Sequence, residues 1–267
     1  MSTRVNNRGI EGIGRRQRIC EILLEHGYVD VLELSKQLGV DSATIRRDLQ
    51  RLEAEGAARR VHGGAFPGTV RDRQGVEIEF GLRMNFQAEP KRKIARRAAA
   101  LIKSGDTVFL DAGTTAFMVA QELINHNDIV VATHSVAVIN ALQSARGITL
   151  IVVGGRLHPH TRSLIGPMTE EAVRSFQFRK MILATAGIDY MNRALTDCAL
   201  EEVPIKRVAM SRSEQVILVA DQGKFGKPSL VSLIPLAGVH TVVTDSAPPE
   251  AAVAVLRSLN IELITVE

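Results

Sequence analysis

Small and polar residues follow an apolar segment near the middle of the chain, and their types suit anion binding. Asp111 ends the segment, and Gly113, Thr114 and Thr115 follow it at the start of a predicted helix. Gly113 lets the backbone approach a ligand, the threonine hydroxyls can donate hydrogen bonds, and a helix amino terminus favours negative charge. Such turns are also common in purely structural roles, so the motif alone does not establish a site.

Similar residues follow four more apolar segments. They are His134 and Ser135, then Gly155 and Arg156, then Gly187 and Asp189, and finally Lys224, with Lys206 on a helix between the last two segments. If these segments are parallel strands, their carboxyl ends meet at one edge of a sheet, where ligands bind in α/β proteins. The sequence therefore predicts a polar pocket for a small anion. Chance recurrence of polar residues in loops is the alternative.

The elements that would position these residues alternate between strand and helix from residue 89 onward. We expect strands at 107–110, 129–132, 148–153, 181–184, 216–220, 241–244 and 261–266. We expect helices from residue 90 and at 135–144, 168–176, 203–210 and 249–259. The strands are nearly continuously apolar, which is typical of strands buried on both faces. This pattern predicts an α/β domain with a mostly parallel sheet covered by helices. The basic run 91–97 is interpreted as a solvated helix face.

A second candidate surface lies in residues 41–56, which the pattern predicts to be one helix. Asp41 can cap its amino end, and Gly56 can end it. The stripe that would pack inward consists of Ile45, Leu49 and Leu52. The residues that would face outward are Ser42, Ala43, Thr44, Arg46, Arg47 and Arg51. Short side chains on the first turn beside arginines suit a helix that enters a DNA major groove. An ordinary amphipathic surface helix is the alternative.

The neighbouring segments favour DNA binding. Residues 15–26 predict an amphipathic helix, and a further helix is expected between Asp30 and Gly39, which makes a helix-turn-helix. Residues 57–66 are typical of a β-hairpin wing, with Gly63 and Gly64 at its bend. A small winged helix-turn-helix domain is therefore expected before the α/β domain. The candidate contacts to double-stranded DNA are Ser42, Thr44, Arg46, Arg47, Arg51, Arg59, Arg60 and His62.

Length and composition set the remaining expectations. The chain has 267 residues, enough for a small domain and a larger one with its own core. A formal charge of +4 is only mildly basic, and two cysteines are too few for a disulfide framework. No apolar stretch approaches the length of a membrane span, and no signal peptide is evident, so a cytoplasmic protein without membrane contact is expected. The expected organisation is a flexible arm at 1–14, the winged domain at 15–66, a linker at 67–88 and the α/β domain at 89–267.

Three motifs together resemble the DeoR family of bacterial transcription regulators. They are Arg-Arg-Gln-Arg-Ile at 15–19, Thr-Ile-Arg-Arg-Asp-Leu at 44–49 and Arg-Val-His-Gly-Gly-Ala at 60–65. The resemblance covers the chain from about residue 15 to its end. It implies a repressor of a carbohydrate-metabolism operon, usually oligomeric, that a phosphorylated sugar or related anion releases from DNA. A homodimer or homotetramer is expected, because one winged helix contacts too few base pairs for selectivity.

The resemblance also implies roles for individual residues of the second domain. The sensor domain of this family is similar in fold to ribose 5-phosphate isomerase. Gly113, Thr114 and Thr115 match its phosphate loop, and Asp111 would position them or bind a ligand hydroxyl. The residues that match the far side of the site are Glu202, Lys206 and Lys224. The chain departs from the family at His134, where asparagine is usual, and at Pro204, so ligand choice can differ.

Two further functions are possible on residue types alone. Asp111, Asp189, Glu202 and Lys206 could supply groups for a sugar-phosphate isomerase, but the spacing of that enzyme is missing and a winged helix would have no purpose there. His158 and His160 form one His-x-His pair without further ligands at suitable spacing, so metal binding is not expected. We therefore predict no catalytic residue, no metal site and no cofactor.

Overall fold

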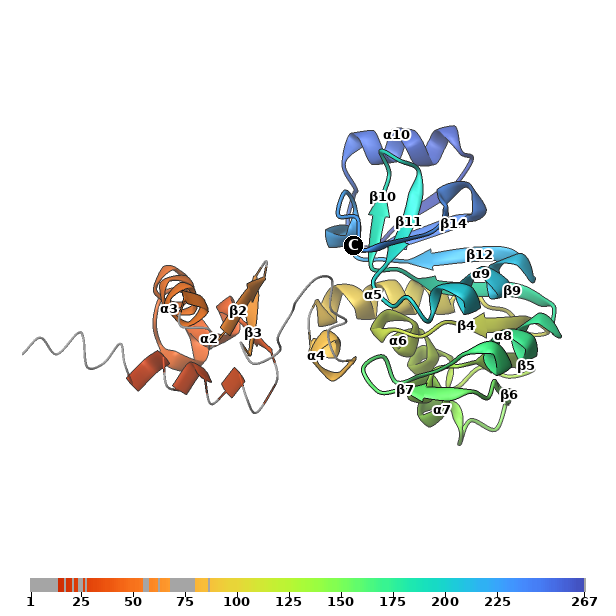
Figure 1. Ribbon diagram of the computed structural model, residues 1–267, viewed down its shortest axis with the longest axis horizontal. Coiled ribbons are helices and arrows are strands. Elements are labelled where there is room, and N and C mark those ends of the chain that lie inside the picture. Colours follow the sequence, from red (N-terminus) through yellow and green to blue (C-terminus); the bar gives the residue numbers. More distant parts are fainter. Residues whose placement is uncertain are drawn as a thin grey trace, which may run out of the picture. The chain divides into compact units, whose positions relative to one another are not determined.

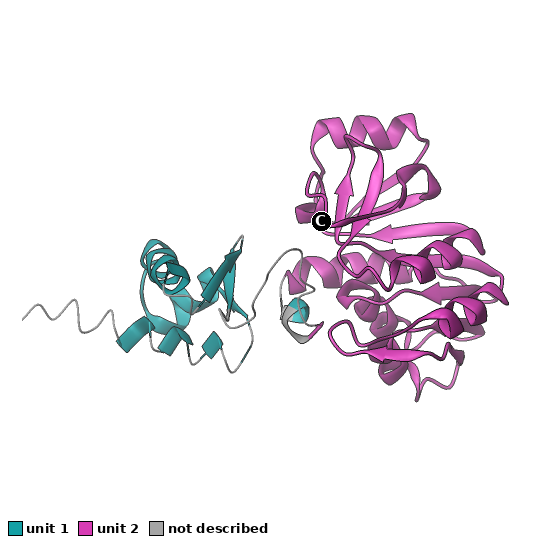
Figure 2. Cartoon of the chain, viewed as in Figure 1, with its two compact units in different colours: residues 1–74, 81–86 teal, residues 75–80, 87–267 magenta. Residues whose placement is uncertain are grey.

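The computed structural model describes residues 14–16, 18–20, 22–23, 26, 28–54, 58–61, 63–67, 80–85 and 87–266. The chain divides into two compact units, coloured separately in Figure 2. Unit 1 comprises Met1–Gln74 and Gly81–Phe86, and unit 2 comprises Gly75–Phe80 and Gln87–Glu267. The expected arm lies almost wholly outside the described residues, as does most of the expected linker, so the predicted domain boundaries stay predictions.

Unit 1 contains the expected helices. The described residues between 14 and 26 are helical, and Ile19, Ile22 and Leu23 are buried as predicted. Helix α2 (Val31–Leu38) begins after Asp30, whose carboxylate accepts the N–H groups of residues 32 and 33. It ends at Gly39, which has the left-handed backbone conformation.

Helix α3 (Ser42–Ala54) follows the helix-turn-helix turn. Asp41 caps it by accepting the Thr44 N–H at 2.8 Å, as expected. The predicted inward stripe is buried and consists of Ile45, Leu49 and Leu52. The predicted stop at Gly56 lies outside the described residues. Local sequence therefore accounts for both the start of the helix and the face that it buries.

The wing is larger than the predicted hairpin. Strands β2 (Ala58–Val61) and β3 (Gly64–Pro67) pair antiparallel, and β1 (Val29–Asp30) adds a third strand on the other side of β3. Gly63 has a φ of 88° and forms the bend, whereas Gly64 already belongs to β3. A Cβ atom at Gly64 would lie 2.1 Å from the carbonyl oxygen of Val29, so only glycine fits there.

Unit 2 is built on a parallel sheet of seven strands (Figure 1). In chain order they are β4 (Thr107–Leu110), β5 (Ile129–Thr133), β6 (Ile148–Val152), β9 (Phe178–Ala184), β12 (Ser213–Val219), β14 (Thr241–Thr244) and β15 (Glu262–Thr265). Their spatial order is β15-β14-β12-β9-β4-β5-β6. The direction of winding thus reverses between β4 and β9. In sheets of this kind, ligands bind beyond the carboxyl ends of the strands at such a switch point.

Helices cover the sheet and lie close to the predicted positions. They are α5 (Ala88–Ala99), α6 (Thr114–Leu123), α7 (Val136–Leu142), α8 (Pro167–Arg174), α9 (Val203–Ser211) and α10 (Glu250–Ser258). Helices α8, α9 and α10 share one hydrophobic cluster with Phe109, Met181 and Leu218 of the sheet. Val108 and Leu110, whose side chains point to the opposite face, are also fully buried. Both faces of the sheet are therefore covered, and the α/β fold class is confirmed.

Several segments differ from the predictions. The segments between β6 and α8 and between β9 and α9 were expected to be loops. They contain instead the hairpin β7 (Arg156–His158) and β8 (Ser163–Ile165), and the strands β10 (Gly187–Asp189) and β11 (Ala194–Asp197). Strand β13 (Val231–Pro235) joins these last two in a small antiparallel sheet. These strands are only three to five residues long, so their pattern did not reveal them.

Two smaller corrections concern the expected linker and the first helix that follows it. Phe80–Asn85 forms helix α4 within the region expected to be a linker. The basic run at 91–97 is not solvated throughout, because Lys91 is only 4 % exposed. Lys91 lies one turn before Ile94 and Ala95 on the buried side of α5, so its stem is covered together with them.

Candidate functional site

The outer surface of α3 carries most of the residues predicted to contact DNA. Arg46, Arg47 and Arg51 are exposed, and Ser42 is half-buried. Neither Arg46 nor Arg51 has a side-chain partner among the described residues. The Arg47 Nε donates only to the Ala43 carbonyl of its own helix, at 3.3 Å. These guanidinium groups are therefore available to an external anion such as a DNA phosphate or to a guanine edge.

Other predicted DNA contacts have partners within unit 1. The Thr44 hydroxyl donates to Asp41 at 2.8 Å, so it also supports the helix cap. Arg60 forms an ion pair with Glu53 at 3.4 Å, and the Arg59 guanidinium lies over the Phe66 ring. His62 lies outside the described residues.

Buried Asp48 anchors two basic residues from the first helix. Arg15 Nε lies 2.6 Å from one carboxylate oxygen of Asp48, and Arg16 lies 3.7 Å from the other. Asp48 is only 4 % exposed, so these contacts hold the first helix against α3.

Asp111 lies at the switch point between β4 and β9 and is fully buried. Its Oδ1 accepts from the Ala112 N–H at 2.8 Å and faces His134 Nε2 at 3.3 Å. Its Oδ2 accepts from the Ala184 N–H at 3.0 Å and lies 3.2 Å from Lys206 Nζ. A carboxylate has about four lone-pair positions, and all of them are used here. Of the two expected roles, positioning therefore fits this geometry, because no position is left for a ligand hydroxyl.

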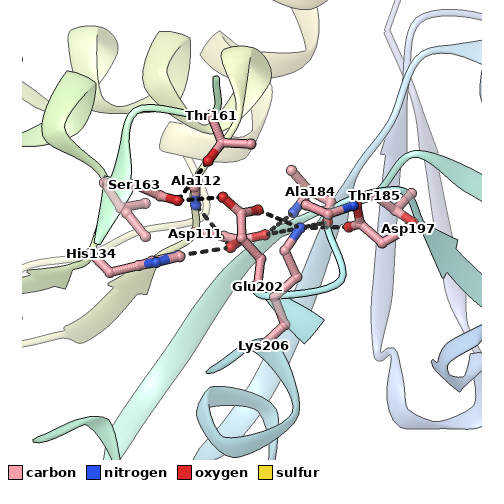
Figure 3. A network of polar contacts seen from close by, with 12 residues as sticks. Asp111, Ala112, His134, Thr161, Ser163, Ala184, Thr185, Asp197, Glu202 and Lys206 are labelled. Carbon is pink, nitrogen blue, oxygen red and sulfur yellow. Dashed lines mark hydrogen bonds and ion pairs between the residues drawn. The ribbon is translucent and has the colours of Figure 1, made fainter. Parts of the chain in front are cut away.

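Lys206 on α9 is enclosed by carboxylates (Figure 3). Its Nζ lies 2.7 Å from Asp197, 3.2 Å from Asp111 and 3.8 Å from Glu202, and it also donates to the Ala184 carbonyl at 3.1 Å. Burial opposes the charged form, but Asp111, Asp197 and Glu202 outweigh it and raise the pKa of Lys206. The ammonium is only 3 % exposed. Its charge thus holds β4, β9, β11 and α9 together at the carboxyl edge of the sheet.

The hairpin β7–β8 is joined to the same network. Ser163 on β8 donates to Glu202 at 2.6 Å and also bonds Thr161 at 2.7 Å. On β7, Arg156 and His158 both contact Glu201, the neighbour of Glu202. The hairpin is therefore fastened to the start of α9 by two successive glutamates.

The amino terminus of α6 lies at this same edge, three residues after Asp111. Gly113 precedes the helix with a φ of 124°, which favours glycine, and no side chain caps the helix. The first N–H groups of a helix have no acceptor within the helix, and its dipole favours an anion there. The hydroxyls of Thr114 and Thr115 have no hydrogen-bond partner among the residues that the structure describes. This terminus can therefore bind a small anion.

The remaining predicted site residues lie apart from this cluster or have local partners. Asp189 accepts from Asn192 within a turn, and Lys224 lies in the 3-10 helix η1 (Gln222–Lys224). Ser135 caps α7 by accepting the Val138 N–H. Gly155 and Gly187 pack tightly against Thr169 and Lys227. Their proposed ligand contacts stay predictions. The sequence missed Asp197, Ser163 and Thr161, because no pattern marks single polar residues on short strands.

An isomerase would need a carboxylate free to act as a base. Asp111 has no free acceptor position, and Asp189 is engaged in its turn.

Within the described residues, no group of three or more His, Cys, Asp or Glu side chains could hold a metal ion. The helices that the structure describes include none with the length and apolarity needed to cross a membrane.

Family comparisons agree with this two-part architecture. Residues 15–67 match the DeoR-like helix-turn-helix domain, and residues 86–246 match the DeoR C terminal sensor domain. The chain belongs to the DeoR family. It is a DNA-binding transcriptional regulator and not an enzyme.

Two relatives match almost the full chain. The glycerol-3-phosphate regulon repressor of Escherichia coli is 34 % identical over 93 % of this chain and 97 % of its own length. The putative aga operon transcriptional repressor of another Escherichia coli strain is 32 % identical over 94 % of this chain and 93 % of its own length. A ribose 5-phosphate isomerase from Methanocaldococcus jannaschii covers 52 % of this chain and 55 % of its own, with 14 % identity and a TM-score of 0.40. That likeness is too weak to support an argument.

Proposed function

We propose that this chain represses a carbohydrate-metabolism operon and leaves its operator when a small phosphorylated metabolite binds unit 2. The uncapped amino terminus of α6 at the switch point carries this proposal. It combines a helix dipole, a close backbone approach at Gly113 and two hydroxyls that have no hydrogen-bond partner among the described residues. A phosphate group matches all three features.

Other side chains at the carboxyl edge of the sheet differ in whether they are free to contact the anion. Lys206 was expected to close on the anion, but its ammonium contacts carboxylates and a carbonyl. Arg156 is 64 % exposed and bonded to Glu201, and an incoming anion could compete for it. In this proposal, the α6 terminus binds the phosphate and the Asp111–Lys206 network keeps that terminus in place.

The relatives support the chemical class of the effector. One of them is a glycerol-3-phosphate regulon repressor, so a three-carbon phosphate ester is the first compound to test. The second is a putative aga operon repressor. His134 stands where the family usually has asparagine, and it contacts Asp111, two residues before Gly113. A different organic portion of the ligand is therefore expected.

The α3 surface supports the DNA half of the proposal. Exposed arginines beside short side chains on the first turn can reach base edges and phosphates. A homodimer or homotetramer would place two such helices on two half-sites. The effector changes DNA affinity only if it binds more tightly to the arrangement that leaves DNA. A 100-fold release needs about 2.7 kcal/mol of coupling, within the usual range.

The test is a thermal-shift screen of phosphorylated sugars, polyol phosphates and their unphosphorylated parents, followed by titration of labelled operator. We expect a phosphorylated compound to stabilise the protein and to release the DNA, because a ligand at 100 times its dissociation constant adds about 2.7 kcal/mol. Stabilisation by an unphosphorylated sugar at equal concentration would contradict the phosphate site. Tighter DNA binding with ligand would contradict the sense of regulation.

A further inference from the structure

The ring of His134 is held between two hydrogen-bond acceptors. Nδ1 lies 3.0 Å from the Leu164 carbonyl oxygen on β8, and Nε2 lies 3.3 Å from Asp111 Oδ1 at the end of β4. A carbonyl oxygen cannot donate, so Nδ1 must carry a hydrogen. A neutral imidazole carries only one hydrogen, and its Nε2 lone pair would then face a carboxylate oxygen.

The surroundings of Asp111 decide where the second hydrogen lies. The other three acceptor positions of this carboxylate are filled by the Ala112 and Ala184 N–H groups and by Lys206. These donors stabilise the ionised carboxylate, and the remaining position faces His134. The arrangement is therefore complete when His134 is an imidazolium that donates on both sides.

Charged groups on the neighbouring elements also favour the imidazolium form of His134. The acidic groups around the ring are Asp111 after β4 and Glu202 at the start of α9, with Asp197 beyond Lys206. Lys206 is the only lysine among the described members of this network and is shared by all three carboxylates. Burial opposes the charged ring, but the hydrogen bond that the ring donates to Asp111 and the charges of Glu202 and Asp111 raise the pKa of His134. Three carboxylates and one lysine leave net negative charge, which an imidazolium reduces.

The bonds of His134 connect the two parts that border the proposed anion site. Its backbone carbonyl accepts from the Leu164 N–H at 2.7 Å, so ring and backbone both tie β8 to the end of β5. On the other side it fixes Asp111, whose Oδ1 also holds the Ala112 N–H. Ala112 is followed directly by Gly113 and the amino terminus of α6. A change at His134 is thus transmitted to the anion-binding turn through a single carboxylate.

We infer that His134 is a positioning residue of the effector site. We also infer that binding of an anion at the amino terminus of α6 favours the form of the His134 ring that carries two hydrogens. This inference rests on the proposed function, because it requires the anion to bind at that terminus. An anion near the imidazolium stabilises its charge, so the protonated protein binds the anion more tightly. Affinity should therefore fall as the pH rises through the titration of His134.

The first test needs no ligand. The chain has seven histidines, and nitrogen NMR of histidine-labelled full-length protein reports whether each ring carries one hydrogen or two. Comparison with His134→Asn assigns the signal, with His134→Gln as the substitute if that variant does not fold. We expect the His134 ring to carry two hydrogens at neutral pH, because an acceptor lies on each side of it. A singly protonated His134 at neutral pH would overturn the inference and leave the proposed function untouched.

The second test uses inorganic sulfate, which stays a dianion between pH 6.5 and 8.5, so its own titration does not contribute. Its affinity is measured calorimetrically at both ends of this range for the wild type, His134→Asn and the matched control His126→Asn. We expect the wild type and the control to lose about fivefold or more in affinity at the higher pH, as for typical coupling energies. We expect His134→Asn to lose much less. Sulfate binding without pH dependence in the wild type would refute the proton linkage alone. If neither sulfate nor any phosphate ester binds, the anion site itself is wrong, and the linkage with it.

Discussion

The outer face of α3 and the switch-point network of unit 2 use charged residues in opposite ways. On α3, Arg46 and Arg51 are exposed and have no partner among the described residues. At the switch point, Asp111 and Lys206 are buried and every hydrogen-bonding position of both is used. The α3 surface is available to bind DNA, whereas the network holds in place the backbone at the start of α6, where we propose that the anion binds. Charge at a predicted site therefore does not by itself indicate a contact to the ligand.

The largest effect that separates these roles is expected for Asp111→Asn. The amide has one acceptor oxygen where the carboxylate has two, so an NH₂ group would face the donors at the other position, such as Lys206 and the Ala184 N–H. Breaking such a buried pair typically costs about 3–5 kcal/mol. Urea unfolding of the purified variant measures this, with the exposed change Glu171→Gln as the control. A fully stable Asp111→Asn protein with impaired effector binding would show that Asp111 contacts the ligand instead.

Thr114→Val should act on the ligand and not on the fold. It removes a hydroxyl that has no hydrogen-bond partner within the described part of the chain. A hydrogen bond to a charged group is worth about 1.5–3 kcal/mol, or roughly 10- to 150-fold in affinity. The variant should bind operator normally but resist release by the effector, as a super-repressor. Effector titration of the operator complex measures this, and Thr149→Val on the exposed side of β6 is the matched control. Release at the wild-type concentration would place the anion elsewhere.

Arg46→Ala and Arg47→Ala should each weaken operator binding while unit 1 stays folded. A specific arginine contact to a base is worth about 1–3 kcal/mol, and loss of a phosphate contact should reduce the salt dependence by about one ion. Operator affinity measured by fluorescence anisotropy at several salt concentrations distinguishes loss of a base contact from loss of a phosphate contact. Arg257→Ala on α10 is an exposed-arginine control. Unchanged affinity in both α3 variants would reject this face as the DNA surface.

The smallest expected effect is a pH dependence of the stability of unit 2. The raised pKa of His134 stabilises the folded state fully below about pH 6.5, and this stabilisation is lost as the pH rises through the folded pKa. Burial opposes ionisation of Asp111, but Lys206 and His134 lower its pKa, so its contribution is lost only at acid pH. One proton changes the free energy of unfolding by at most about 1.4 kcal/mol per pH unit. Denaturant melts between pH 6 and 9 should show a decline that His134→Asn lacks. A parallel decline in both would assign the effect to other groups.

Segments whose structure depends on nearby residues were predicted correctly from the sequence. The cap at Asp41, the stripe of Ile45, Leu49 and Leu52, and all seven strands of the parallel sheet were predicted. Each depends on periodicity or on a cap within a few residues. The hairpin β7–β8 and the sheet β10-β11-β13 were missed, because strands this short gain their stability from packing and not from their own pattern.

By itself the sequence determined the two-part architecture, the family and the identity of the turn at Gly113, since these depend on local spacing. It also placed Asp111, His134 and Lys206 at strand ends or on a nearby helix. Only the tertiary structure decided what those side chains do. Asp111 bonds His134, Ala184 and Lys206, which are 23, 73 and 95 positions away in the chain. Such distant partners meet only after the sheet has formed, so their hydrogen bonds and charges leave no local pattern to detect.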